Sequence, residues 1–124
     1  GQRVVLIDDS IVRGNTSPRI VARVREAGAR EVHLRVGCPP IIAPCYLGID
    51  MPSREEFIAP GKSAEEITRD VGADSVAYIS IDGLVRAIGK PRDDLCLGCI
   101  SEEYPVPIPG ERIRGQSTLK EFEA

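Results

Sequence analysis

Residues 4–17 read VVLIDDSIVRGNTS, and this stretch sets the architecture expected of the whole chain. Its first four residues form a continuous apolar run, which is typical of a strand buried on both faces of a parallel sheet. The run ends at two consecutive carboxylates, Asp8 and Asp9. Ser17 is expected to cap a helix that has Pro18 in its first position. The stretch therefore predicts a strand, a loop and a helix start, and α/β sheets bind ligands at such strand ends.

The expected helix leads to a second strand. Its apolar residues fall on one stripe, and Gly28 is expected to end it. Residues 32–36 then alternate between apolar and polar with period two, as in a strand. Because a helical crossover joins parallel strands, these elements predict a β-loop-α-β unit. The predicted fold class is α/β with a parallel sheet.

The centre of the chain predicts more elements of the same kind. Ser53 and Ser63 each stand three residues before a glutamate, which is typical of a capping box at a helix start. The second of these helices is expected to end at Gly72. Residues 75–80 predict a third strand, and the apolar stripe that follows predicts a helix ending at Gly89. Three strands are few for an independent α/β domain, so we expect the C-terminal part of a larger protein.

Two segments are not expected to form regular elements. Residues 37–52 contain four prolines and two cysteines, which predicts a long, shaped loop. Residues 96–99 are expected to form a turn, and an extended tail with three prolines follows it. Only Ser117–Glu123 could form a last helix there. The expected organisation is therefore an α/β part at residues 1–90 and a C-terminal extension at residues 91–124.

The composition excludes several classes of protein. The chain has 124 residues, 42% of them hydrophobic and 28% charged, with a net charge of -3. It is too apolar for a disordered chain and too acidic for a general nucleic-acid binder. Its longest apolar stretches run only four or five residues, against about 20 for a membrane span. We expect a cytoplasmic protein without nucleic-acid or membrane partners.

The loop after the first strand has the chemistry of a phosphate site. Free N–H groups and the positive dipole end at a helix start attract phosphate, and Gly14 allows close backbone approach. Two carboxylates beside a phosphate fit sugar hydroxyls or Mg²⁺, so the expected ligand is a ribose phosphate with Mg²⁺. In the simpler interpretation, Asp8 and Asp9 only cap a turn, and the whole arrangement counts against it. The stretch also lacks the glycine-lysine loop of nucleoside triphosphatases and the GxGxxG of dinucleotide sites.

On these residues the chain resembles the type I phosphoribosyltransferases. DDSIVRGNTS (residues 8–17) is similar to their motif for phosphoribosyl pyrophosphate (PRPP). Together with REAGA (25–29) and YLGIDM (46–51), it resembles the glutamine PRPP amidotransferase branch up to about Tyr104. The resemblance implies the parallel-sheet phosphoribosyltransferase core, and synthesis of 5-phosphoribosylamine from PRPP and glutamine in the first step of purine synthesis. It implies that Asp8 and Asp9 engage the ribose and Mg²⁺, and that the 5'-phosphate is bound by Ser10, Ile11, Val12, Arg13, Gly14, Asn15, Thr16 and Ser17.

The chain also departs from that family. The N-terminal cysteine glutaminase domain is absent from it, as are the strands that carry the pyrophosphate loop and the flexible active-site loop. We therefore expect a C-terminal fragment that holds half of a site and is inactive alone. The implied partners are PRPP, a glutaminase domain of the same parent chain, and further copies in a homo-oligomer.

The cysteines suggest a metal centre. Cys96 and Cys99 form a CxxC pair that can present two thiolates to one metal, and Cys45 could supply a third. From the residues alone, zinc, a redox dithiol, an iron-sulfur cluster and unrelated thiols all stay open. The resemblance implies a structural [4Fe-4S] cluster held by Cys45, Cys96 and Cys99, with a fourth ligand upstream of this chain. Cys38 is expected to be a small buried hydrophobe.

Two classes of function remain. One is an enzyme that transfers a nitrogen nucleophile onto C1 of PRPP, and the other is a phosphoribosyltransferase-like regulator that senses PRPP or a nucleotide. A basic DNA-binding segment would favour the regulator, and the sequence shows none. His33 is expected to be structural, and the paired glutamates at 55–56 and 65–66 are expected to stand at solvated helix starts. Arg13 either contacts phosphate or is a surface charge.

Overall fold

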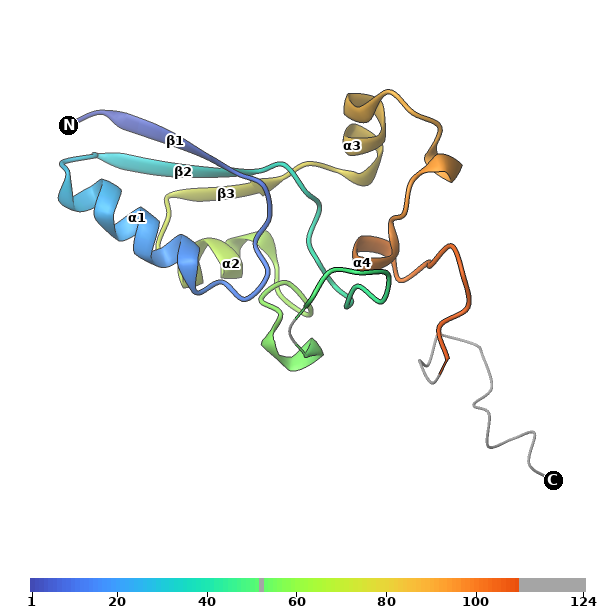
Figure 1. The fold of residues 1–124 in the computed structure, drawn as a ribbon. Coiled ribbons are helices and arrows are strands. Elements are labelled where there is room, and N and C mark those ends of the chain that lie inside the picture. Colours follow the sequence, from blue (N-terminus) through green and yellow to red (C-terminus); the bar gives the residue numbers. More distant parts are fainter. Residues whose placement is uncertain (52, 110–124) are drawn as a thin grey trace.

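The computed structural model describes residues 1–51 and 53–109. Their core is a sheet of three parallel strands in the order β1-β2-β3 (Figure 1). The strands are β1 (Arg3–Asp8), β2 (Glu31–Val36) and β3 (Ser75–Tyr78). The predicted α/β class with a parallel sheet is confirmed.

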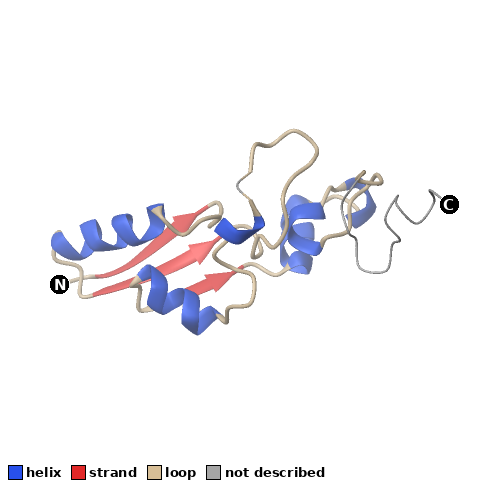
Figure 2. Cartoon of the chain, turned by 90° about the horizontal axis from the view of Figure 1, so that it is seen from below, coloured by secondary structure: helices blue, strands red, loops and turns tan. Residues whose placement is uncertain are grey.

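Helix α1 (Thr16–Glu26) joins β1 to β2, and α2 (Ala64–Val71) precedes β3. Both helices lie on the same side of the sheet (Figures 1 and 2). The sequence placed the start of α1 too late, because its N-cap is Asn15 and Ser17 is already the second helical residue. Pro18 fits the third position because the first N–H groups of a helix have no intrahelical partner.

One of the two predicted capping boxes is present. The Ser63 side chain accepts a bond from the Glu66 N–H, the Glu66 side chain accepts one from the Ser63 N–H, and Gly72 ends α2 in the left-handed region. At Ser53 the prediction is wrong. A 3₁₀ turn at Arg54–Glu56 follows it, and the Ser53 hydroxyl donates to the Glu56 carboxylate at 3.2 Å instead of accepting from the backbone.

The remaining elements lie towards the C-terminus. Helix α3 (Ile81–Ile88) ends at Gly89 as predicted, a 3₁₀ turn spans Arg92–Asp94, and α4 (Gly98–Ser101) follows. The expected CxxC turn is therefore partly helical. Residues 37–51 form neither helix nor strand, as expected, and the predicted helix at Ser117–Glu123 lies outside the described residues.

The first hydrophobic core fills the space between the sheet and helices α1 and α2. It contains Ile11, Val21, Val32, Leu34, Val36, Ile58, Ala59, Ile67, Val71 and Val76. The opposite face of β1 is open, with Val5 58% and Ile7 77% exposed. The expectation that this strand is buried on both faces is wrong for this chain, because the described helices that pack on the sheet lie on one side of it.

A second hydrophobic core lies between the loop at 37–51, α3 and the C-terminal segment, by which we mean residues 95–104. Its buried members are Ile41, Phe57, Leu97 and Ile100. The N–H groups of Ile42 and Ala43 donate to the Cys99 carbonyl at 2.9 and 3.1 Å, and the Tyr104 hydroxyl donates to the Pro44 carbonyl at 2.7 Å. The C-terminal segment therefore packs directly against the proline-rich loop.

In the part of the chain that the structure describes, no helix has the length and apolar character that a membrane crossing requires.

Asp74 and Arg25 together link α1, β2 and the end of α2. Its Oδ2 accepts bonds from the Val32 N–H at 2.7 Å and from Arg25 Nη2 at 2.8 Å. Arg25 also donates to the Gly72 carbonyl at 3.1 Å. The Val32 N–H and then Arg25 hold the pKa of the Asp74 carboxyl below its ordinary value. The link should therefore depend on pH.

We expect Asp74→Asn to loosen the start of β2 and to remove part of its acid sensitivity. An unfolded aspartate has a pKa of about 3.9. Because the folded pKa is lower, the contact stabilises the fold above that pH and is lost as the pH falls through the folded pKa.

Hydrogen exchange of residues 30–36 in the complete protein measures this directly. Wild-type protection should fall in that acidic range, whereas the variant should be less protected at neutral pH and change less. Asp93→Asn, at an exposed carboxylate, is the control, and identical profiles for Asp74→Asn and wild type would contradict the account.

Candidate functional site

Two carboxylates stand at the carboxyl end of β1. The Asp9 N–H donates to Asp8 Oδ1 at 2.9 Å, and the Ser10 N–H donates to Asp9 Oδ1 at 2.7 Å. These bonds fix one oxygen of each carboxylate against the local backbone. In residues 1–51 and 53–109 no hydrogen bond reaches either Oδ2 atom, so both carboxylates keep an oxygen for a ligand.

The loop after Asp9 is anchored on both sides. Ile11 is 2% exposed and belongs to the first hydrophobic core, whereas Val12 packs against the second. Gly14 has a φ of +70°, and a Cβ built on it would lie 2.3 Å from Ile58 Cδ1. The loop therefore needs glycine at this position both for its backbone conformation and for its contact with Ile58.

The loop delivers the chain to the N-terminus of α1. The N-cap Asn15 makes no side-chain capping bond, and the first turn of the helix carries no acidic residue. The N–H groups of this turn have no intrahelical partners, and the helix dipole is positive there. The site can therefore hold an anion without displacing a capping side chain.

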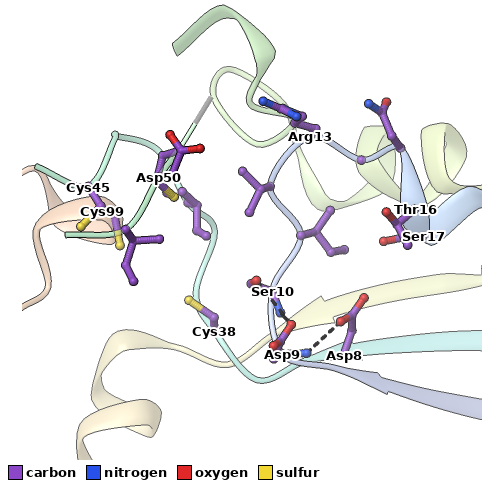
Figure 3. A pocket seen from close by; sticks show the side chains of 17 residues that line it. Asp8, Asp9, Ser10, Arg13, Thr16, Ser17, Cys38, Cys45, Asp50 and Cys99 are labelled. Carbon is purple, nitrogen blue, oxygen red and sulfur yellow. Dashed lines mark hydrogen bonds between the residues drawn. The ribbon is translucent and has the colours of Figure 1, made fainter. Parts of the chain in front are cut away.

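A pocket of about 800 Å³ runs along the loop (Figure 3). All ten residues of the predicted phosphate motif, 8–17, line it. Residues that the sequence did not single out for this site complete the lining: Cys38, Ile41, Ile49, Asp50, Met51 and the predicted metal ligands Cys45 and Cys99. In the sequence, these residues are marked only by their place in the proline-rich loop at residues 37–52, which carries all of them except Cys99.

Arg13 is paired with a neighbouring glutamate. Its Nε lies 3.0 Å from Glu56 Oε2, and both side chains are about half exposed, 51% and 48%. The sequence placed Glu56 on a solvated helix start, and the contact with the phosphate loop was missed. Nothing local signals such a contact between residues 43 positions apart.

Three of the four thiols, those of Cys38, Cys45 and Cys99, line the same pocket. Burial raises the pKa of the Cys99 thiol, and the nearby Cys45 and Cys96 raise it further. The pKa of the Cys38 thiol is raised by burial and then by Cys99 and Asp9. Cys38 lines the same pocket as Asp9 and Cys99, and it is half-buried rather than buried as expected.

The carboxylates and the thiols around the pocket are ligands for different kinds of metal. No group of three or more His, Cys, Asp or Glu side chains in the described ranges is arranged to hold a single metal ion. Two carboxylates with open oxygens fit Mg²⁺, which is usually held by one or two carboxylates together with substrate oxygens. Cys45, Cys96 and Cys99 offer thiols, which are the protein ligands of iron-sulfur clusters.

Two solved structures share this fold. The glutamine PRPP amidotransferase of B. subtilis, complexed with ADP and GMP, matches 90% of this chain with a TM-score of 0.80 and 48% identity. A structure described as the allosteric regulatory enzyme of purine biosynthesis matches 90% with a TM-score of 0.79 and 47% identity. The chain covers 25% of each. Fold and site thus define a segment of the phosphoribosyltransferase class of α/β proteins.

The sequence relatives narrow the class. The chain is 59% identical over 116 residues to an amidophosphoribosyltransferase of Methanocaldococcus jannaschii and 50% identical over 112 residues to that of Bacillus subtilis. These matches cover 94% and 87% of this chain and 24% of each relative. No family model matches the sequence. The chain belongs to the amidophosphoribosyltransferase family and spans about a quarter of the length of these relatives.

Proposed function

We propose that the segment is the PRPP-binding part of an enzyme that makes 5-phosphoribosylamine from PRPP and glutamine, the first step of purine synthesis. One observation carries this proposal. Two carboxylates with open oxygens and an uncapped helix N-terminus line one pocket on either side of the anchored loop. A ribose 5-phosphate presents hydroxyls that suit the carboxylates and a dianion that suits the helix N-terminus.

Each part of the pocket has its own task in this proposal. Asp8 and Asp9 accept hydrogen bonds from the ribose hydroxyls and stabilise the positive charge that develops on the ring as pyrophosphate leaves. The N–H groups of residues 13–17 and the Thr16 hydroxyl donate to the 5'-phosphate. Ile11 and Val12 hold the loop so that the ligand does not have to order it.

Mg²⁺ is part of the proposal, with Asp8 and Asp9 as its protein ligands. When bound, the ion offsets the negative charge of the leaving pyrophosphate. The carboxylates orient the ribose whether they contact it directly or through the ion. Their placement at a strand end keeps them fixed relative to the phosphate loop.

Turnover by the complete protein tests the proposal against a regulator that only senses PRPP. The relatives described above carry enzyme names, which does not favour the regulator. The complete protein should consume PRPP and form phosphoribosylamine with glutamine or ammonia. The 124-residue segment alone should do neither, since it covers only about a quarter of those relatives. PRPP binding without turnover by the complete protein would support the regulator.

We also propose that Cys45, Cys96 and Cys99 hold a [4Fe-4S] cluster together with a fourth ligand outside this chain. Support comes from the packing of the proline-rich loop on the Cys99 carbonyl, which brings together segments more than 50 residues apart. The N–H of Leu47 donates to Cys45 Sγ at 3.4 Å, a contact suited to a thiolate. A cluster there would stabilise a region with a small core of its own.

The cysteines should differ in their effect on cluster content. We expect Cys45→Ser, Cys96→Ser and Cys99→Ser in the complete protein to lose most of the iron and sulfide after anaerobic reconstitution. Cys38→Ser is the matched control and should keep both. Iron and sulfide analysis measures the content independently of activity. Loss with Cys38→Ser and retention with Cys45→Ser would reverse the ligand choice, and stoichiometric zinc without sulfide would exclude the cluster.

The wider organisation follows the same proposal. Residues 1–90 would form the phosphoribosyltransferase part and residues 91–124 an extension, of which Cys99 and Tyr104 contact the proline-rich loop. A glutaminase domain of the same parent chain would supply the nitrogen, in a homo-oligomer of complete chains. The cytoplasm is the proposed compartment, and its thiol buffers would keep Cys45, Cys96 and Cys99 reduced and available to a cluster. A relative from Arabidopsis thaliana is chloroplastic, so the compartment differs within the family.

A further inference from the structure

The pocket along the phosphate loop carries more negative than positive charge. Among the described residues that line it, Asp8, Asp9 and Asp50 are acidic and Arg13 is the only cation. An anionic ligand is therefore opposed by three carboxylates and attracted by one guanidinium. The state of that guanidinium has a large influence on how strongly the pocket attracts phosphate.

The guanidinium of Arg13 is engaged on one side by Glu56. The contact joins Nε to Oε2 at 3.0 Å, which occupies one of the edges through which a guanidinium can make bidentate contacts with phosphate. Glu56 also adds a fourth negative charge next to the pocket. Both effects lower the affinity of the loop for an anion.

The position of Glu56 is fixed by the fold. The Ile58 N–H donates to the Val12 carbonyl at 2.9 Å, and Ile58 belongs to the first hydrophobic core. The Ser53 hydroxyl donates to Glu56 Oε1 at 3.2 Å. Arg54 Nη1 lies 2.9 Å from Glu102 Oε1, which ties the same 3₁₀ turn to the end of α4. The glutamate is therefore held beside Arg13 by contacts on several sides.

We propose that Glu56 is a positioning residue that sets a low affinity of the phosphate loop for anions by engaging Arg13. It acts through the arginine and does not contact the ligand. When a phosphate binds, Arg13 exchanges its carboxylate partner for the ligand. This inference rests on the proposed function, since it assumes that the loop binds the phosphate of a ribose phosphate.

Removal of the Glu56 charge should tighten binding. An exposed ion pair contributes up to about 1 kcal/mol, so Glu56→Gln should bind inorganic phosphate and ribose 5-phosphate about two- to fivefold more tightly. In turnover, the same variant should lower the KM for PRPP with little change in kcat. A merely structural role of Glu56 predicts the opposite sign, because a loosened loop binds more weakly.

Calorimetry on the complete protein, with inorganic phosphate and ribose 5-phosphate as probes, tests this. Arg13→Gln should weaken binding. In the Arg13→Gln background, Glu56→Gln should give a smaller gain than in the wild-type background, because only the loss of one negative charge remains. Glu55→Gln, on the same turn, is the matched control for the loss of one negative charge and should show a smaller gain. The gain should also shrink at high ionic strength.

The outcomes separate the two proposals. Equal or weaker binding by Glu56→Gln, or an equal gain in Glu55→Gln, would overturn the role of Glu56 and leave the phosphate loop intact. Wild-type protein that binds neither probe would overturn the phosphate loop and this inference with it.

Discussion

The Asp8→Asn, Asp9→Asn double variant of the complete protein should lose at least about a hundredfold in kcat/KM for PRPP. Each lost hydrogen bond to a charged group contributes about 1.5 to 3 kcal/mol, and about 1.4 kcal/mol corresponds to a tenfold change in rate. The fold should survive the change. An asparagine keeps the Oδ1 acceptor that binds the following N–H, so the local bonds of both residues remain possible. Steady-state kinetics with glutamine and with ammonia measures the loss.

A matched control exists in the same chain. Asp93 and Asp94 are also consecutive and exposed, and they lie in the 3₁₀ turn at Arg92–Asp94. The Asp93→Asn, Asp94→Asn variant removes the same charge without touching the pocket, so it should keep its kcat/KM. If the Asp8, Asp9 variant turned over PRPP normally, the two carboxylates would not bind the ribose.

Gly14→Val should strongly weaken the binding of ribose 5-phosphate. The residue has a φ of +70°, which a β-branched side chain avoids, and its Cβ would lie 2.3 Å from Ile58 Cδ1 and 3.2 Å from Ile58 Cγ1. Backbone strain of this kind costs on the order of 1–3 kcal/mol, and overpacking adds about as much. The loop would relieve both by moving, which misplaces the N–H groups that face the phosphate. Calorimetry on the complete protein measures the affinity.

The control separates backbone strain from the contact with Ile58. Gly61 has a φ of +74°, and a Cβ there would meet nothing within 4 Å. Gly61→Val therefore introduces the same backbone strain away from the loop and should bind the ligand normally. Ile58→Val removes Cδ1 and should restore part of the affinity of Gly14→Val. Unchanged affinity in Gly14→Val alone would mean that the loop is only a turn.

The sequence predicted those elements whose signals are local. The apolar run before Asp8, the alternation at residues 32–36 and the capping box at Ser63 each depend on neighbours in sequence, and each element is present. The capping box predicted at Ser53 is absent because no α-helix follows it. The chain makes a single 3₁₀ turn and then enters the first hydrophobic core at Ile58. The open face of β1 was missed because an apolar run does not tell which face is covered.

In the candidate site too, the features with local signals in the sequence were predicted, and those that depend on distant contacts were not. The phosphate motif is continuous in the sequence, so its ten residues could be listed before the fold was known. The pair of Arg13 with Glu56 and the approach of Cys45 to Cys99 depend on how the proline-rich loop crosses the end of the sheet. Proline-rich segments have no period that would predict their path. Their contacts follow from packing with distant residues such as Ile100 and Phe57.

A crystal structure of the complete protein with ribose 5-phosphate and Mn²⁺ in place of Mg²⁺ tests the central claim most directly, because the anomalous signal of manganese locates the metal. The account predicts that the phosphate accepts bonds from the N–H groups of residues 13–17, and that the ribose hydroxyls and the metal lie at the free oxygens of Asp8 and Asp9. A phosphate bound elsewhere, with the loop at residues 10–17 empty, would contradict it.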